Sequence, residues 1–503
     1  MSTLRALGRN ISWNYVQAGT SLVVAFLLTP LVLQHLGEVG FGVWVLLKAI
    51  LFYLAFLDFG LYNALVKYLA EYAEREDWPA ANGLLRTATS ALAVAGLAAL
   101  VAAALVAWLL IPHAFNVPAE RLGELRLATV LLGVDLLLAF PASALAAALE
   151  GRQRFDVLSA VSIAATVVLA AATVASLRLG YGILGLVGIE IAGTVLTAGL
   201  HLRLLRQLYP RVRPGFGPLA GSSLRRIRGY STWTSLNEIL AEGSAEVEKL
   251  LIPIVLSVSL LTPYTLICTV AAVIFLTIEP ITDTFFPLSS AYDAKDDRGR
   301  LRALLLRGTK LVMAISLPLA VAVVVWGERF IVAWIGEDRV AVPEGVMPLV
   351  VASFSITAFI MTGTTILLAL ARVKEVFWMG IAELALAVTL VLLTVPRYQL
   401  VGLAASLLLA NALVTFLWIV PYVSRLLDQN PTDFLGQSLF RPLMAAVPMV
   451  AFILWLERHL PGAALWELAL KAGLAGGVYL AAFYLVSLTA EERALCSASL
   501  RNR

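Results

Sequence analysis

Runs of about 20 apolar residues recur along the whole of this chain, and a helix of that length can cross the hydrocarbon core of a bilayer. The chain is 60% hydrophobic and only 14% charged, whereas soluble domains contain roughly 25% charged residues. We therefore predict an all-α, polytopic integral membrane protein with about 14 transmembrane helices. The predicted spans are 11–35, 42–65, 84–111, 125–149, 157–177, 182–205, 231–262, 264–290, 304–326, 346–370, 375–395, 400–424, 442–457 and 466–487.

Positive charges predict how these spans are oriented. If both chain ends are cytoplasmic, most of the 37 Lys and Arg residues fall in cytoplasmic segments, as the positive-inside rule expects. Basic loops beside anionic headgroups also account for the net charge of +4. We therefore expect membrane lipids, and no nucleic acid, as partners of the basic segments.

A basic cytoplasmic segment divides six predicted spans from eight. It contains Pro210, Pro214 and Pro218 and several arginines, and we interpret it as a linker because proline interrupts helices. The predicted domains are an N-lobe at 1–206, this linker at 207–229, a C-lobe at 230–425, and two further spans with a cytoplasmic tail at 426–503.

The two predicted lobes resemble each other in sequence. LLTPLVL at Leu27–Leu33 aligns with LLIPIVL at Leu250–Leu256, and the acidic Glu74–Asp77 falls close to the acidic Asp293–Asp297. The first span thus matches the seventh, and an offset of six spans preserves the direction of each helix. The alignment predicts two pseudo-symmetric six-helix lobes, an arrangement that binds cargo between the lobes.

Residues 36–77 place charges inside an apolar span. Lys48 and Asp58 lie within the second span, which we expect to continue without a turn into a polar helix ending at Glu74–Asp77. Charged groups are costly in lipid, so they usually face a protein-lined or water-filled interior. This layout favours a transporter over an enzyme.

No combination of residues typical of catalysis or metal binding is evident. The histidines (His35, His113, His201 and His459) and the cysteines (Cys268 and Cys496) are scattered, and the first outward segment offers only Glu38 as an acid. This argues against a membrane glycosyltransferase or polymerase, because its chemistry needs general acids and bases on an outer loop. We predict that the chain is not an enzyme and has no cofactor.

Several segments resemble a known family. They are LGEVGFGVW, AFLDFGLYNALVKYLAEY, EGRQRFDVLSAV, LRLGYGILGLVGIE and EKLLIPIVLSVSLLTPYTL. Together, from about residue 8 to residue 425, the chain resembles polysaccharide-transport flippases, in particular the O-antigen flippase branch of the multidrug/oligosaccharidyl-lipid/polysaccharide superfamily. The resemblance implies two six-helix lobes around a central cavity, followed by two helices.

The resemblance also implies a cargo, an oligosaccharide on undecaprenyl diphosphate that moves from the cytoplasmic to the outer leaflet. Lys48 and Lys249 are candidate cations for the diphosphate, although each could instead snorkel or pair with an acid, Lys249 with Glu246 at i+3. The pair Glu248-Lys249 stands where the family often has Asp-Lys or Asp-Arg. We expect Asn14, Gln17 and Ser21, on one face of the first span, to contact sugar hydroxyls or neighbouring helices.

Acids in the C-lobe are candidates for cation coupling. Glu238, Glu242 and Glu246 lie on one helical face of the seventh span, and Glu383 lies in the eleventh. Because relatives couple transport to Na⁺ or H⁺ through C-lobe carboxylates, the resemblance implies that these acids bind the coupling ion; a structural ion-pair cluster is the alternative. The sequence assigns no role to the other acids within spans, which are Asp58, Asp135, Glu190, Glu279 and Asp283, although Asp58 could cap or brace the N-lobe.

The sequence thus predicts a flippase for lipid-linked oligosaccharide in the bacterial cytoplasmic membrane, an antiporter if the coupling ion moves inward, with glycan polymerase machinery as a partner. A drug or organic-cation exporter and a lipid II flippase of the same superfamily are the alternatives. The drug exporter should favour a cavity of acids and aromatic residues, which the two lysines do not match.

Overall fold

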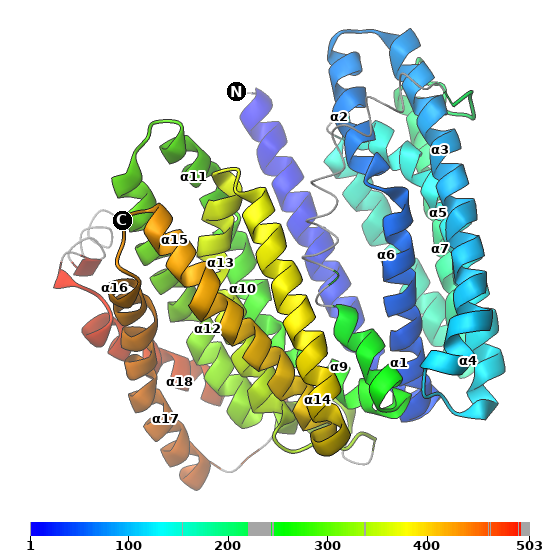
Figure 1. Cartoon of the computed structure of the whole chain (residues 1–503). Coiled ribbons are helices and arrows are strands. Elements are labelled where there is room, and N and C mark those ends of the chain that lie inside the picture. Colours follow the sequence, from blue (N-terminus) through cyan, green and yellow to red (C-terminus); the bar gives the residue numbers. More distant parts are fainter. Residues whose placement is uncertain are drawn as a thin grey trace. The chain divides into compact units, whose positions relative to one another are not determined.

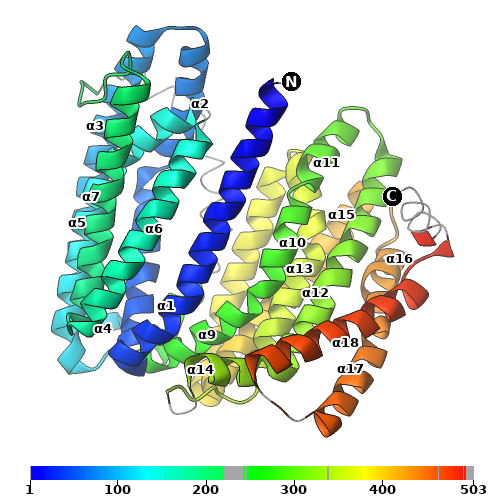
Figure 2. The same cartoon turned by 180° about the vertical axis from the view of Figure 1, so that it is seen from behind.

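The computed structural model describes residues 2–152, 154–219, 243, 246–336, 339–460, 462, 464–490 and 492–493, with the backbone alone for 2–12, 14 and 15. Helices make up nearly all of these residues (Figures 1 and 2). The contacts divide the chain into an N-terminal unit, Met1–Thr262, and a C-terminal unit, Pro263–Arg503. Each unit is described by itself below.

The N-terminal unit is built on three long helices that lie side by side, with α5 between α3 and α7 (Figures 1 and 2). The helix α1 packs mainly against α6. The helices of this unit are α1 (Ser2–Ala55), α2 (Leu61–Glu74), α3 (Trp78–Leu105, continued by a π-helical turn to Leu110), α4 (Ile111–Ala114), α5 (Ala119–Glu150), α6 (Phe155–Arg178), α7 (Gly182–Leu208), residues 246–255, and the 3₁₀ turns η1 (Phe56–Asp58) and η3 (Val258–Leu260).

The C-terminal unit is built around α12, which packs against α10, α13, α17 and α18. Its core is rich in large side chains such as Trp326, Phe359, Phe434 and Tyr479. The helices are α9 (Leu261–Ala271, which begins at the unit boundary), α10 (Val273–Thr282), α11 (Phe285–Asp293), α12 (Arg298–Ile335), α13 (Val346–Ala369), α14 (Val373–Val414, continued by a π-helical turn into α15, Val420–Leu426), α16 (Pro431–Leu435), α17 (Arg441–His459) and α18 (Leu465–Val486).

The prediction of an all-α chain of membrane-spanning helices is confirmed. Among the described residues, 10 helices are long and apolar enough to cross a membrane, and there are 11 if the pair Val258–Ala271 and Val273–Asp293, bent by 43°, is counted as one span. Two of the 10 are interrupted by non-helical backbone, α1 at Gly37 and α14 at Gln399. Each of these therefore contains two of the predicted spans.

The expectation that the second span continues without a turn is wrong. The helix ends at Ala55, and η1 is followed by two residues with positive φ, Phe59 at 51° and Gly60 at 66°. The Asp58 carboxylate accepts a hydrogen bond from the Gly60 N–H (2.9 Å). The turn therefore depends on a glycine that adopts positive φ without strain and on a local acceptor, which makes Asp58 a brace for this break.

The predicted repeat is visible in one local structure. Before α3, the N–H of Asp77 donates to Tyr72 (3.0 Å) and its side chain caps Ala80 N. Before α12, Asp297 donates to Tyr292 (3.0 Å) and its side chain caps Arg300 N. In both places the preceding residue has positive φ, 55° and 49°. The two acidic segments that align in sequence thus form the same helix-starting turn, with a side-chain N-cap.

The beginning of the predicted linker is bonded to α3. The Asn82 side chain donates to the Arg211 carbonyl (2.9 Å) and accepts from the Arg213 N–H (2.7 Å), and Ser90 exchanges hydrogen bonds with Gly217. Residues 211–218 are therefore part of the N-terminal unit, and residues 220–229 lie outside the described residues.

The segment before α9 also packs on the N-terminal unit. Tyr53 donates to the Gly243 carbonyl (2.5 Å), and Asn116 N–H donates to the Pro253 carbonyl (2.7 Å). A Cβ added at Gly42 would lie 2.2 Å from the Val258 carbonyl oxygen, so α1 approaches this segment through a glycine. By contact the boundary falls at residue 262, whereas the span pattern begins the C-lobe at 230; the domain boundaries stay a prediction.

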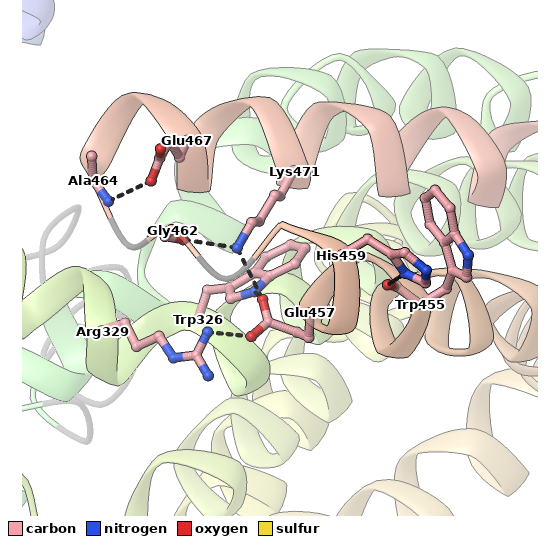
Figure 3. Close-up of polar contacts among 9 residues, drawn as sticks. All are labelled: Trp326, Arg329, Trp455, Glu457, His459, Gly462, Ala464, Glu467 and Lys471. Carbon is pink, nitrogen blue, oxygen red and sulfur yellow. Dashed lines mark hydrogen bonds and ion pairs between the residues drawn. The ribbon is translucent and has the colours of Figure 1, made fainter.

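Two buried lysines join the last helices to α12. At one end, Glu457 of α17 accepts from Lys471 of α18 (3.2 Å) and Trp326 (2.8 Å), and pairs with Arg329 (Figure 3). At the other end, Lys310 binds both carboxylate oxygens of Glu492 (3.0 Å each). Burial raises the pKa of the Glu492 carboxyl, but hydrogen bonds from Thr489 N–H and Lys310 outweigh it and hold the pKa below its usual range.

Candidate functional site

A group of three charged residues inside the spans lies in the N-terminal unit, on helices α1, α5 and α7. Lys48 of α1 donates to Glu190 of α7, with 2.9 Å between Nζ and Oε1. The Lys48 ammonium also lies 5.4 Å from the ring centroid of Trp44, one turn earlier in α1. The pair therefore joins two predicted spans that are far apart in sequence.

Asp135 of α5 is the third member of this group. Its side chain interacts with Glu190 and Lys48 and accepts a hydrogen bond from Thr194, one turn after Glu190 on α7. The residue is 6% exposed, and its Oδ1 has no hydrogen-bond partner among the described residues. Lys48 and Glu190, in contrast, keep 43% and 37% of their side-chain area exposed. The accessible pair thus lies beside a buried acid.

Close helix packing explains why Asp135 is buried. Two residues before it, a Cβ added at Gly133 would lie 2.7 Å from the Ala103 Cβ of α3. Glycine here lets α3 and α5 approach closely, so the centre of α5 is enclosed between α3 and α7. Asp135 and Glu190 can both be recognised in the sequence as charges within apolar spans. The sequence does not show that both interact with Lys48.

The second predicted cation is also paired. Lys249 forms an ion pair with Glu246, three residues earlier on the same helix. Pairing with Glu246 is the alternative that the sequence offers for Lys249. The ion pair joins a residue predicted to contact substrate to an acid predicted to bind the coupling ion. Tyr53, on α1 after Lys48, reaches the same segment through Gly243.

The other predicted residues are less fully placed. Gln17 lies half-buried and Ser21 exposed on α1, and the side chain of Asn14 lies outside the described residues. Glu383 is half-buried on α14, and no described residue bonds to it. Glu238 and Glu242 lie outside the described residues. The structure therefore joins Glu246 with Lys249, and the roles of the other predicted residues stay predictions.

No three His, Cys, Asp or Glu side chains of the described chain come close enough together to hold a metal ion. The Lys48 group can hold a cation or a proton on its acids, or present its ammonium to an anion.

A family model described as "Polysaccharide biosynthesis protein" matches residues 32–341. No curated protein matches the chain. Among solved structures, an inward-facing multidrug resistance MATE transporter of the MOP superfamily covers 81% of this chain and 95% of its own, at a TM-score of 0.66 and 13% identity.

Two further structures extend the comparison. The lipid II flippase MurJ, in an inward closed conformation, covers 94% of this chain and 99% of its own at a TM-score of 0.66 and 11% identity. A point mutant of the Vibrio cholerae MATE transporter VcmN covers 86% and 99% at a TM-score of 0.58 and 13% identity. At these identities the similarity establishes a common fold.

Proposed function

This chain belongs to the polysaccharide biosynthesis protein family, and on that premise we propose that it is a flippase for an oligosaccharide linked to undecaprenyl diphosphate. It moves this cargo from the cytoplasmic to the outer leaflet of a bacterial cytoplasmic membrane by alternating access. The observation that carries the proposal is that the polysaccharide-family match coincides with a transporter fold: residues 32–341 lie within a chain whose fold is shared by MATE transporters and MurJ.

The chemistry of the cargo fits this fold. A diphosphate and a hydroxylated sugar chain cannot enter hydrocarbon without compensation, whereas a polyprenyl tail stays in lipid. The half-exposed ammonium of Lys48, within a membrane-spanning helix, is a suitable partner for the diphosphate. Lys249, whose side chain is less exposed, is the second candidate.

Coupling to a Na⁺ or H⁺ gradient is part of the proposal. Glu246 and Glu383 are the described acids assigned to it by resemblance, together with Glu238 and Glu242. We further propose that both chain ends are cytoplasmic, that the chain transports without catalysing a reaction, and that the glycan polymerase machinery receives its product.

A deletion strain tests the function. Loss of the gene should abolish a surface glycan and leave its lipid-linked unit on the cytoplasmic leaflet, and the wild-type gene should restore both. An intact surface glycan in the deletion strain would overturn the proposal.

The solved structures favour two second candidates, because the MATE transporter and MurJ share this fold at the same TM-score. A drug exporter predicts that the deletion strain becomes sensitive to organic cations while its surface glycan persists. A lipid II flippase predicts the accumulation of peptidoglycan precursor instead of the glycan unit. The same strain thus separates all three functions.

A further inference from the structure

The ion pair between Lys48 and Glu190 leaves the charge of the N-terminal site unbalanced unless Asp135 carries a proton. One lysine faces two carboxylates. If both acids were ionised, a net negative charge would remain in a membrane-spanning segment, where an uncompensated charge is costly. With a proton on Asp135 the three residues together are neutral. The Oδ1 atom of Asp135, which has no hydrogen-bond partner among the described residues, then carries no uncompensated negative charge.

No other charged group of the described chain compensates Asp135. Of the helices that pack against α5, α3 contains one charged residue, Arg86, which bonds to the Arg213 carbonyl. The helix α6 has charges only near its ends, at Asp156 and Arg178, and α2 meets α5 where Tyr62 bonds to Glu150. The charges that act on Asp135 are therefore Lys48 from α1 and Glu190 from α7.

We propose that Lys48, Glu190 and Asp135 form a proton-linked anion site, in which a diphosphate displaces Glu190 from Lys48 and Glu190 takes up a proton as it loses its cation. The inference rests on the proposed function for the identity of the anion. Glu190 occupies the place of the diphosphate while the site has no cargo, because a carboxylate and a phosphate oxygen both accept the same ammonium hydrogen bond.

The exposure of the pair allows this exchange. Lys48 and Glu190 are each more than one-third exposed, so the protein does not enclose them, and an anion can approach Nζ and a proton the carboxylate. The exchange forms one O–H bond on Glu190 with a proton from solvent, and no other covalent bond changes. Asp135, which is buried, keeps its proton throughout. Anion binding and protonation therefore strengthen each other, as linked equilibria must.

The purified full chain in detergent can be titrated with farnesyl diphosphate as the probe and farnesol as the control for its tail. Calorimetry in buffers of different ionisation enthalpy measures the protons taken up. We expect about one proton per bound diphosphate, weaker binding as pH rises, and no proton uptake with farnesol. Diphosphate binding without proton uptake would overturn the inference.

Variants assign the proton to one acid. Glu190→Gln should abolish proton uptake and bind the diphosphate up to about fivefold more tightly, because an exposed competing ion pair is gone. Asp135→Asn should keep the wild-type proton uptake, since the amide replaces a carboxyl that is neutral throughout. If Asp135→Asn abolished the uptake and Glu190→Gln kept it, the assignment would be wrong.

Further variants guard against loss of fold. Lys48→Ala should weaken diphosphate binding at least tenfold, and Lys48→Arg should keep it. If neither variant binds the diphosphate, their thermal unfolding shows whether they are folded. Glu190→Ala, which keeps Lys48, should still bind the diphosphate. Glu124→Gln, which breaks the Arg121–Glu124 pair elsewhere on α5, is the matched control and should leave proton uptake unchanged. These binding measurements are independent of surface glycan, so they can fail while the deletion strain confirms the function, and the reverse.

Discussion

Two lysines within membrane-spanning helices, Lys48 in the N-terminal unit and Lys471 in the C-terminal unit, differ in exposure and in partners. Lys48 is 43% exposed and bonds to one carboxylate. Lys471 is 3% exposed and bonds to Glu457 and to the Gly462 carbonyl, while Glu457 also binds Arg329 and Trp326 (Figure 3). A buried lysine with several partners anchors helices, whereas an accessible lysine with a single partner can exchange it.

The Lys310–Glu492 pair belongs with the anchors. Its lysine is also 3% exposed, and its carboxylate receives a further hydrogen bond from Thr489 N–H (2.8 Å). Glu457 of α17 thus links Lys471 of α18 to α12, and Lys310 of α12 binds Glu492, which follows α18, through residues that a sequence pattern does not connect. Four substitutions test the contrast between the anchoring pairs and the exchangeable pair.

Glu457→Gln should have the largest effect on stability. The amide would leave Lys471 and Arg329 without a compensating charge, and breaking a buried ion pair by removing one partner costs about 3–5 kcal/mol. Thermal unfolding of the purified protein should show a clear fall in Tm. Glu467→Ala, which removes the acceptor of Ala464 N–H at the start of α18, is the control and should cost about 1 kcal/mol. Equal effects would contradict the anchor role.

Glu492→Gln should have a smaller effect that depends on pH. Because the folded pKa of Glu492 is lowered, its contribution to stability is present above the unfolded pKa of about 4.3 and is lost as pH falls through the folded value. The wild type should therefore be more stable than the variant at pH 7, by about 1–3 kcal/mol, and the difference should shrink below about pH 4. A constant difference between neutral and acidic pH would contradict the ion pair.

Lys48→Ala should change the free energy of unfolding by about 1 kcal/mol or less, because it removes an accessible pair. Its effect on surface-glycan export should nevertheless be large, about tenfold or more, if the ammonium binds the diphosphate with one charge-assisted hydrogen bond. Export of glycan and Tm are measured in parallel. A large fall in Tm with unchanged export would place Lys48 among the anchors.

Lys249→Ala should have the smallest effect on stability, about 0.3–0.5 kcal/mol, since Glu246 lies on the same helix three residues away. The effect on export decides whether this second cation acts on cargo. Unchanged export in both Lys48→Ala and Lys249→Ala would remove the cationic site from the proposed function.

Much of the fold could be predicted, because the length of an apolar run is set by the thickness of a bilayer. Spans such as 157–177 and 466–487 agree closely with α6 and α18. The break after Ala55 could not be predicted in this way, because apolar residues continue through it and the turn depends on Asp58 and Gly60. The sequence also singled out Lys48, since a charge in an apolar run is visible without knowing its neighbours.

The class of protein, the positions of most spans, the repeat and the list of intramembrane charges can all be predicted from the amino-acid order, because each follows from residues close together in the chain. Which of those charges meet depends on how the helices pack. Glu190 lies 142 residues from Lys48, and Asp135 interacts with both because α5 packs beside α7. An ion pair depends on a distance of a few ångströms between side chains, and helix packing sets that distance.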